Sequence, residues 1–120
     1  MRHTPTDIIL HRVSGQLEIA YADGARHRLD AEYLRVYSPS AEVRGHGLPE
    51  PLLVPGKEGV RIAALDPVGQ YALKIVFDDG HDSGLYDWDL LHDLGETRSA
   101  RWQHYLDRLA AAGLARTPTP

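Results

Sequence analysis

Short segments in which apolar and polar residues alternate occur along most of the chain, a pattern typical of strands with one buried face. Residues 8–13 are apolar and rich in β-formers, and residues 17–21 follow the alternating pattern. Asp23 and Gly24 between them tolerate the positive φ of a tight hairpin turn, and residues 26–29 form the returning strand. The first quarter of the chain is therefore predicted to be an antiparallel meander.

A short helix is expected after this meander. Asp30 is suited to the N-cap, because its carboxylate can accept the free amide hydrogens of a first helical turn. Pro39 disfavours helical geometry at Ser38, so the helix should end there. Residues 41–59 are rich in Gly and Pro and are expected to form a long surface loop. The apolar face of the helix consists of Tyr33, Leu34 and Tyr37.

The second half of the chain repeats the first. Residues 17–34 align without gaps on residues 73–90. Each copy reads as a strand, an Asp-Gly turn, a second strand and a short helix. The matched positions are Leu17 with Leu73, Ile19 with Ile75, Asp23 with Asp79, Gly24 with Gly80, Leu29 with Leu85, and Leu34 with Leu90.

Within the second copy, residues 60–65 are predicted to be a strand and residues 66–69 a turn. The next strand should have one apolar face, and residues 82–86 should pair back on it after the Asp-Gly turn. Asp87 is expected to cap the following helix, and Gly95 suits a left-handed position at its C-terminal end. The apolar face of the strand consists of Tyr71, Leu73, Ile75 and Phe77, and that of the helix of Leu90, Leu91 and Leu94.

A last helix is predicted over residues 97–112, followed by a stop at Gly113 and Leu114. The sequence therefore predicts an α+β fold: antiparallel β-hairpins in a pseudo-repeat, strand–Asp-Gly–strand–helix twice, with a C-terminal helix. Residues 1–115 are expected to form a single domain and residues 116–120 a flexible tail. The inward stripe of the last helix consists of Trp102, Tyr105, Leu106 and Leu109.

Composition limits the class of protein. A chain of 120 residues builds one core, and its 42% apolar and 25% charged residues are near the globular average. No apolar run approaches the roughly 18 residues of a membrane span. The N-terminal residues lack the features of a signal peptide, so a cytoplasmic protein without membrane contact is expected. With a net charge of −4 and no two Lys or Arg residues adjacent, no nucleic-acid partner is predicted.

The chain has no cysteine, which excludes disulfides, thiolate catalysis and cysteine zinc sites. The motifs of the common hydrolases, nucleotide-binding loops and metalloenzymes are also absent, so no catalytic residue is assigned and a non-enzymatic protein is expected. His11 and His27 lie in predicted strands, where they are expected to flank one another across the sheet. His92 and His104 are expected to be surface residues of helices.

His81 is the best candidate for a functional side chain, because it follows the second Asp-Gly turn and has carboxylates at Asp78, Asp79 and Asp82. Carboxylates near an imidazole either raise its pKa or supply hard metal ligands beside a nitrogen ligand. His46, in the predicted loop, is a further candidate ligand for such a site. A solvated hairpin tip is the alternative interpretation.

Two segments carry a family resemblance. Residues 33–41 contain the motif Leu-Arg-x-x-Ser-Pro-Ser-Ala, and residues 68–91 contain Asp-Gly-His-x-Ser-Gly-x-Tyr. In combination they resemble the small bacterial DUF971 proteins, which are similar to the N-terminal domain of γ-butyrobetaine hydroxylase. The resemblance covers residues 6–95, and the catalytic jelly-roll of the hydroxylase is not part of it.

The resemblance implies a degenerate metal site. In the carnitine-synthesis hydroxylases the domain binds a structural zinc through three cysteines and a histidine. The matching positions in this chain are Ser38, Ser40, Val43 and His81. A serine hydroxyl is a poor zinc ligand and valine is none, so no zinc or other cofactor is expected. Ser38, Ser40 and His81 are instead expected to meet and to replace the metal with hydrogen bonds.

Two functions remain open from the sequence. The first is a non-catalytic module that binds an unknown protein partner; similar domains fused to Mrp-type P-loop ATPases suggest an accessory role in iron–sulfur or metal handling. The second is a metal- or small-ligand-binding protein that uses His81 and its neighbouring carboxylates. The candidate binding residues are Arg35, Asp79, His81, Asp82 and Trp88.

Overall fold

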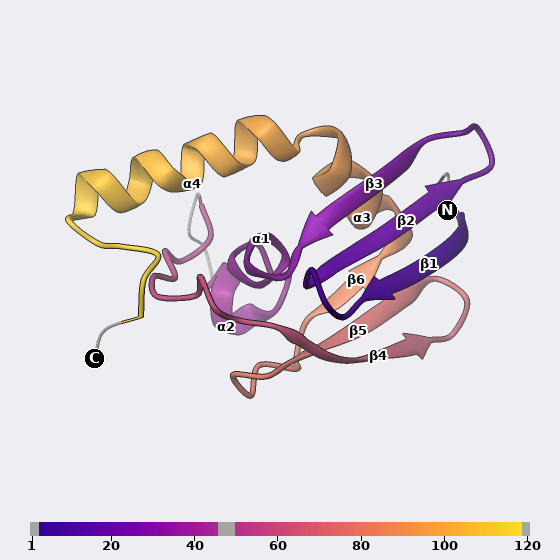
Figure 1. The fold of residues 1–120 in the computed structure, drawn as a ribbon, viewed down its shortest axis with the longest axis horizontal. Coiled ribbons are helices and arrows are strands. Elements are labelled where there is room, and N and C mark those ends of the chain that lie inside the picture. The colour runs from indigo at the N-terminus through magenta and orange to yellow at the C-terminus, as the bar shows by residue number, and fades with distance from the viewer. Residues whose placement is uncertain (1–2, 46–49, 119–120) are drawn as a thin grey trace.

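The computed structural model describes residues 3–45 and 50–118 of the chain. Within these residues, two three-stranded antiparallel sheets and four helices form an α+β fold, which confirms the predicted fold class (Figure 1). The first sheet has the strand order β1-β2-β3 and the second the order β4-β5-β6. Both sheets are therefore meanders in which successive strands lie side by side.

The two halves of the chain have the same order of elements, which agrees with the sequence repeat. In the first half β1 (Pro5–His11), β2 (Gln16–Tyr21) and β3 (Arg26–Asp30) lead directly into α1 (Ala31–Val36). In the second half β4 (Ile62–Val68), β5 (Ala72–Phe77) and β6 (Leu85–Asp87) lead directly into α3 (Trp88–Glu96). We refer to these two halves as the first and second modules. A short helix α2 (Ala41–Arg44) lies between them, and α4 (Arg98–Ala112) follows the second.

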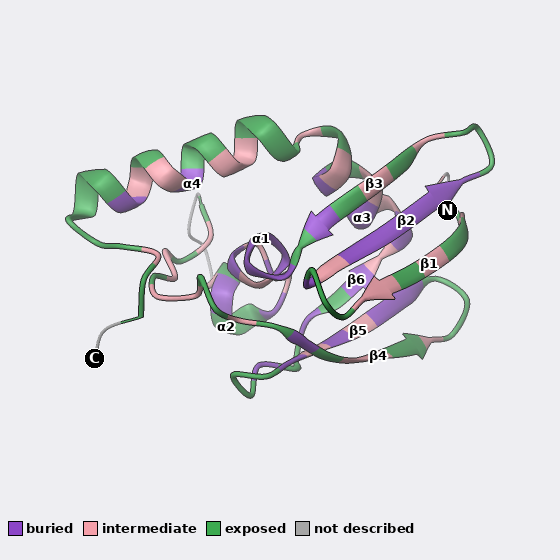
Figure 2. Ribbon diagram, in the orientation of Figure 1, coloured by how far each residue is buried: buried purple, intermediate pink, exposed green. Residues whose placement is uncertain are grey.

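The apolar faces of both sheets contribute to one core, with α1 and α3 packed against it (Figure 2). Two tyrosine hydroxyls join the modules inside this core. Tyr33 of α1 donates a hydrogen bond to the Leu94 carbonyl at 2.7 Å, and Tyr86 of β6 donates one to the Leu34 carbonyl at 2.6 Å. Because these carbonyls lie in the last turns of helices, each bond satisfies an acceptor that the helix itself leaves free. The fully buried sheet and helix residues are Leu17, Ile19, Leu29, Leu34, Ile75, Tyr86 and Leu91.

The C-terminal helix α4 covers α1 through a second, smaller apolar cluster. Tyr105 and Leu109 are buried there against Val36, and Trp102 and Leu106 are partly buried beside them. The predicted inward stripe is thereby confirmed. Gly113 takes up the left-handed conformation, with φ of 68°, and the Leu114 amide donates to the Leu109 carbonyl, as the predicted helix stop requires.

Several local predictions for the first module and the loop after it were wrong. Asp30 stands at the N-cap of α1, but its carboxylate accepts from Gln16 Nε2 at 3.0 Å instead of from the helix. The segment predicted as a loop contains α2, which begins because Ser40 Oγ accepts from the Glu42 amide at 3.2 Å. His11 and His27 do not flank one another, because β2 separates their strands.

The second module also differs in its turns. The first three residues of the predicted turn, 66–68, are part of β4, where Pro67 pairs with Leu73. Proline is tolerated there because β4 is an edge strand. The chain turns later than predicted, at residues 69–71, where Gly69 has a φ of 56°. Tyr71 is 52% exposed rather than part of the apolar face. On the other side, β6 is shorter than expected and starts only at Leu85.

Gly95 lies inside α3, not at a left-handed C-terminal position. Its lack of a side chain has a packing reason, since a Cβ at this position would stand 2.4 Å from Cγ of His27. The glycine therefore lets the imidazole of β3 lie directly on the surface of α3. Helix propensity favours alanine over glycine by about 1 kcal/mol, so only such a close approach explains a glycine here.

The residues that directly follow α4 are held against the rest of the protein by hydrogen bonds. Arg116 forms three hydrogen bonds with the buried carboxylate of Glu32, the shortest at 2.7 Å, and its carbonyl accepts from the Glu58 amide. The Ala115 carbonyl likewise accepts from Gly56. These contacts differ from the frayed tail expected from residue 116 onward. Among the residues that the structure describes, no helix has the length and apolar character to cross a membrane.

Candidate functional site

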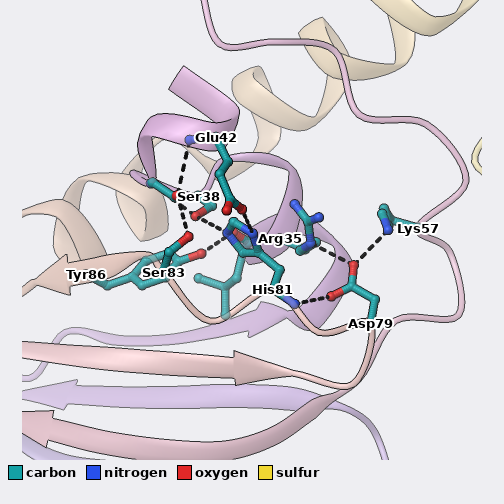
Figure 3. A network of polar contacts seen from close by, with 10 residues as sticks. Arg35, Ser38, Glu42, Lys57, Asp79, His81, Ser83 and Tyr86 are labelled. Atoms are coloured by element: carbon teal, nitrogen blue, oxygen red, sulfur yellow. Dashed lines mark hydrogen bonds and ion pairs between the residues drawn. The ribbon is translucent and has the colours of Figure 1, made fainter. Parts of the chain in front are cut away.

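His81 lies where the turn between β5 and β6 meets the segment that joins α1 to α2 (Figure 3). The turn is closed by a hydrogen bond from the Phe77 amide to the His81 carbonyl, and Gly80 supplies a φ of 91°. The His81 amide donates to Asp79 Oδ1 at 3.1 Å. These backbone contacts direct the imidazole inward, and the residue is only 6% exposed. The solvated hairpin tip that the sequence left open is thus excluded for this side chain.

Both nitrogens of the His81 ring have a partner. Nδ1 lies 3.0 Å from Glu42 Oε2, and Nε2 lies 2.8 Å from Ser38 Oγ. Because an ionised carboxylate only accepts hydrogen bonds, Nδ1 carries the proton. In the neutral ring, Nε2 then accepts from the Ser38 hydroxyl. The ring is thereby held at both polar atoms, with Phe77 packed against it.

Serine hydroxyls extend this contact into a chain of hydrogen bonds. Ser38 Oγ accepts from the Ser40 amide at 3.2 Å, and Ser40 Oγ lies 2.6 Å from Ser83 Oγ. Gly84 makes this approach possible, since a Cβ there would stand 2.5 Å from Ser38 Oγ. We call this set the hydrogen-bonded lock; it consists of Ser38, Ser40, Glu42, His81 and Ser83. It connects the end of the first module and α2 to the second hairpin.

Of the four positions that the resemblance assigned to a zinc site, three lie within this lock. Ser38, Ser40 and His81 come together in the manner expected from the sequence. Val43, the fourth position, lies on α2 and is buried, with 2% of its surface exposed. Its methyl groups offer no donor atom.

A second polar group lies beside the lock. Asp79 Oδ2 is 2.8 Å from Arg35 Nε and 2.7 Å from Lys57 Nζ. Burial alone would raise the pKa of the Asp79 carboxyl, but the hydrogen bonds from Lys57, the His81 amide and Arg35 outweigh this and lower its pKa to about 2. The carboxylate therefore stays ionised and braces the turn from which His81 projects.

The remaining candidates from the sequence do not gather at the imidazole. Asp78 accepts from the Arg61 amide at 3.0 Å, and Asp82 is exposed. Trp88 is 7% exposed, and its indole Nε1 donates to the Gln70 carbonyl at 2.7 Å, so it is part of the core. His46 lies outside the described residues.

The carboxylate that does meet the His81 ring is Glu42, which sequence reasoning missed. It was overlooked because residues 41–59 were interpreted as a loop. The available signal was Ser40, a residue type favoured at helix N-caps, which starts α2 and so turns Glu42 toward the second hairpin. Lys57 and Ser83 were missed as well, and no local pattern in the sequence marks them.

Comparisons with known proteins agree on one family. The model of the family described as gamma-butyrobetaine hydroxylase-like, N-terminal, matches residues 8–92. A crystal structure of a protein with unknown function from Acidithiobacillus ferrooxidans, of the DUF971 family, is 36% identical with a TM-score of 0.65, covering 77% of this chain and 92% of that one. No curated protein matches the chain.

Two solution NMR structures are also similar. One is 47% identical with a TM-score of 0.85, and the match covers 98% of this chain and 93% of the other. The second is 51% identical with a TM-score of 0.83, covering 98% of this chain and 88% of the other. The whole architecture, including the C-terminal helix, is thus shared with solved relatives.

His81→Ala is expected to lower the free energy of unfolding by about 2 kcal/mol, because it removes two hydrogen bonds and leaves the proton of the buried Ser38 hydroxyl without its acceptor. Denaturant unfolding at pH 7 measures this loss. Asp82→Ala is the matched control on the same turn and should change stability by less than about 0.5 kcal/mol, since Asp82 is exposed. Equal stability of the two variants would contradict a structural role for the ring.

Asp79→Asn should lower the free energy of unfolding by on the order of 1 kcal/mol at pH 7. This value allows for solvent screening of a partly exposed carboxylate. The folded pKa lies below the value of roughly 3.9 in an unfolded chain. The ionised group therefore stabilises the fold above pH 4, and this contribution disappears as the pH falls from about 4 to 2. Unfolding curves across this range should converge for wild type and variant. A difference independent of pH would show that the carboxylate charge is not involved.

Proposed function

Because the chain belongs to the family of γ-butyrobetaine hydroxylase-like N-terminal domains, we propose that it is a non-catalytic domain that binds another protein as an accessory module. One observation carries the proposal. At the position where the hydroxylase domains are expected to hold a metal, both ring nitrogens of the buried His81 are engaged by Ser38 and Glu42. Both nitrogens of the buried ring are thus occupied by internal hydrogen bonds rather than free to act on a substrate.

The donor set supports a lock in place of a zinc centre. Zinc in structural sites is bound by four thiolate or imidazole ligands in a tetrahedron. Here two of the matching positions carry hydroxyls that are already hydrogen-bonded, and one carries a valine. The residues present do not fit the metal. Their hydrogen bonds tie the first module to the second hairpin, as a metal would in relatives that have the cysteines.

The alternative function, metal or small-ligand binding by His81 with its neighbouring aspartates, has weaker support. Asp79 directs one carboxylate oxygen at Arg35 and Lys57 and the other at the His81 amide. Asp82 is exposed and lies on the outside of the turn. A ligand at the His81 ring would have to displace Ser38 or Glu42 first.

Exposed apolar side chains of the second module suggest where a partner would bind. Leu85, the first residue of β6, is 50% exposed, and Tyr71, in the turn between β4 and β5, is 52% exposed. Tyrosine is among the residue types enriched in the energetic centres of interfaces. Trp88 and Tyr86, by contrast, are buried in the core and are not available. The proposed link to iron–sulfur or metal handling rests on the likeness to domains fused to Mrp-type ATPases, an analogy of fold.

Replacing Ser38, Ser40 and Val43 together by cysteine should create a zinc site with His81, because it restores the four-ligand set. The triple variant should bind one equivalent of Zn²⁺ more than the wild type. With Co²⁺ as a probe, it should show the near-ultraviolet absorption of thiolate ligands. The triple variant that also carries His81→Ala is the control, and it should bind the metal at least tenfold more weakly. If the wild type already binds zinc and loses it on His81→Ala, the lock interpretation is wrong.

Capture from native cells tests the interaction role directly. A tagged chain, cross-linked in the cell that produces it, should retain one protein in a near-stoichiometric amount. Tyr71→Ser and Leu85→Ser should each reduce this recovery several-fold. Val13→Ser is the matched control, because Val13 is 98% exposed on a turn of the other sheet. Recovery that is equal for all four proteins would place the contact elsewhere, and a chain recovered without a partner would contradict the proposal.

A further inference from the structure

We propose that His27, His92 and Glu96 form a binding site for a divalent transition-metal ion of the Zn²⁺ class. The site lies where β3 of the first module packs against α3 of the second (Figure 1). One ligand atom from each of the three side chains lies within 4.8 Å of the others. The site shares no residue with the hydrogen-bonded lock, and the inference does not rest on the function proposed above.

The fold brings these residues together by simple local rules. His92 and Glu96 are four residues apart on α3, so their side chains are neighbours on one face of the helix. His27 pairs with Ile19 across the first sheet and therefore lies on its core-facing side. Gly95 then allows the His27 imidazole to lie against the helix, because a Cβ at position 95 would collide with the ring. A β-strand histidine is thus placed directly beside a helical histidine–glutamate pair.

The distances between donor atoms match those of a tetrahedral site. His27 Nε2 lies 3.6 Å from Glu96 Oε1, and His92 Nε2 lies 3.5 Å from the same oxygen. Both are too long for direct hydrogen bonds. Metal–ligand bonds of about 2.0–2.1 Å in a tetrahedron separate neighbouring ligand atoms by about 3.3 Å. Both distances to Glu96 therefore fit a shared ion, and the two imidazole nitrogens, within 4.8 Å of each other, would close on it from either side.

Unsatisfied buried atoms provide an independent reason to expect a bound group. In the described residues, His27 Nε2 and Tyr21 Oη are both buried without a hydrogen-bond partner. Buried polar atoms nearly always have a partner, so two in one place call for an explanation. The two rings lie 6.1 Å apart, and Tyr21 also packs edge-on against His92 at 5.0 Å. A cation at the three ligand atoms would supply the missing partner of the imidazole.

The surrounding side chains hold the ligands in place. The ring of His3 stacks on that of His92 with centroids 3.7 Å apart and planes 8° apart, and the His3 amide donates to Asp89. The side chains of His27 and His92 are 18% and 14% exposed, while Glu96 is 53% exposed. Two ligands are thus preorganised, and the third can close on the ion from the solvent side.

The charge pattern does not oppose a cation. The arginines on either side of His27 lie on the other face of the strand, because they pair with Glu18 and Ala20, whereas His27 pairs with Ile19. Glu18 contacts both arginines. Imidazole and carboxylate donors together suit zinc, copper, iron or nickel rather than calcium or magnesium. Three protein ligands leave one tetrahedral position for water or a further donor.

Calorimetric titration of the whole chain with Zn²⁺ at pH 7.5 tests the site. One equivalent should bind with a dissociation constant in the micromolar range or below. Glu96→Gln, at an exposed helical position that should not affect folding, should weaken the affinity at least tenfold, and so should His92→Gln. In NMR spectra, the imidazole signals of His27 and His92 should shift on addition of Zn²⁺ while those of His11 and His104 stay in place.

Two control variants separate this site from the others. His104→Gln and His81→Ala should both leave zinc affinity unchanged. Absence of binding by the wild type, or equal affinity of wild type and Glu96→Gln, would overturn the proposal. If zinc binding were lost in His81→Ala alone, the proposal would be overturned and the hydrogen-bonded lock refuted at the same time. If Glu96→Gln left zinc affinity unchanged while His81→Ala still destabilised the fold, this proposal would be wrong and the proposed function would be unaffected.

Discussion

Burial of two one-sided sheets in a common core is the constraint on which the rest of this fold depends. The apolar face of each meander would be exposed to water if that meander stood alone, and packing against the other module removes it from water. Burying a large apolar side chain contributes about 1.5–3 kcal/mol, and the core residues come from both modules. Within that core, the Tyr33 and Tyr86 hydroxyls cross from one module to the other and satisfy helix carbonyls. The modules are thereby fixed in one relative position.

Both polar clusters lie at the junctions that this arrangement creates. The lock joins the end of α1 to the second hairpin, and the His27 cluster joins β3 to α3. The repeat explains why such places exist, and the differences between its copies decide their chemistry. Ala25 occupies the position in the first hairpin that His81 occupies in the second, so only one hairpin can form the lock. In this protein, function is expected where the pseudo-symmetry is broken.

Prediction from the sequence succeeded where a periodic pattern was long or a residue type had one strong preference. The strands β2 and β5, the cap at Asp87 and the stop at Gly113 were predicted correctly, since each depends on local geometry. The predicted half-buried pattern of β2 was wrong, because Glu18 and Ala20 on its second face are buried as well. Glycine was more ambiguous, because it meets two different needs. Gly95 looked like a helix end, yet it serves the close approach of a ring from another strand. Pro67 looked like a turn and is accommodated at a sheet edge.

By itself, the sequence determined the fold class and the pseudo-repeat, because periodicity and turn chemistry are local properties of the chain. Its two motifs carried the resemblance to the family, and the expectation that Ser38 meets His81 came from that resemblance, since the two residues are 43 positions apart. Only the tertiary structure decided which carboxylate faces each imidazole. Glu42 reaches His81 from α2, Asp79 turns away toward Arg35 and Lys57, and His27 meets Glu96 across 69 positions of sequence. Contacts between side chains on different elements depend on how those elements pack, and that packing is set by the whole core rather than by any one segment.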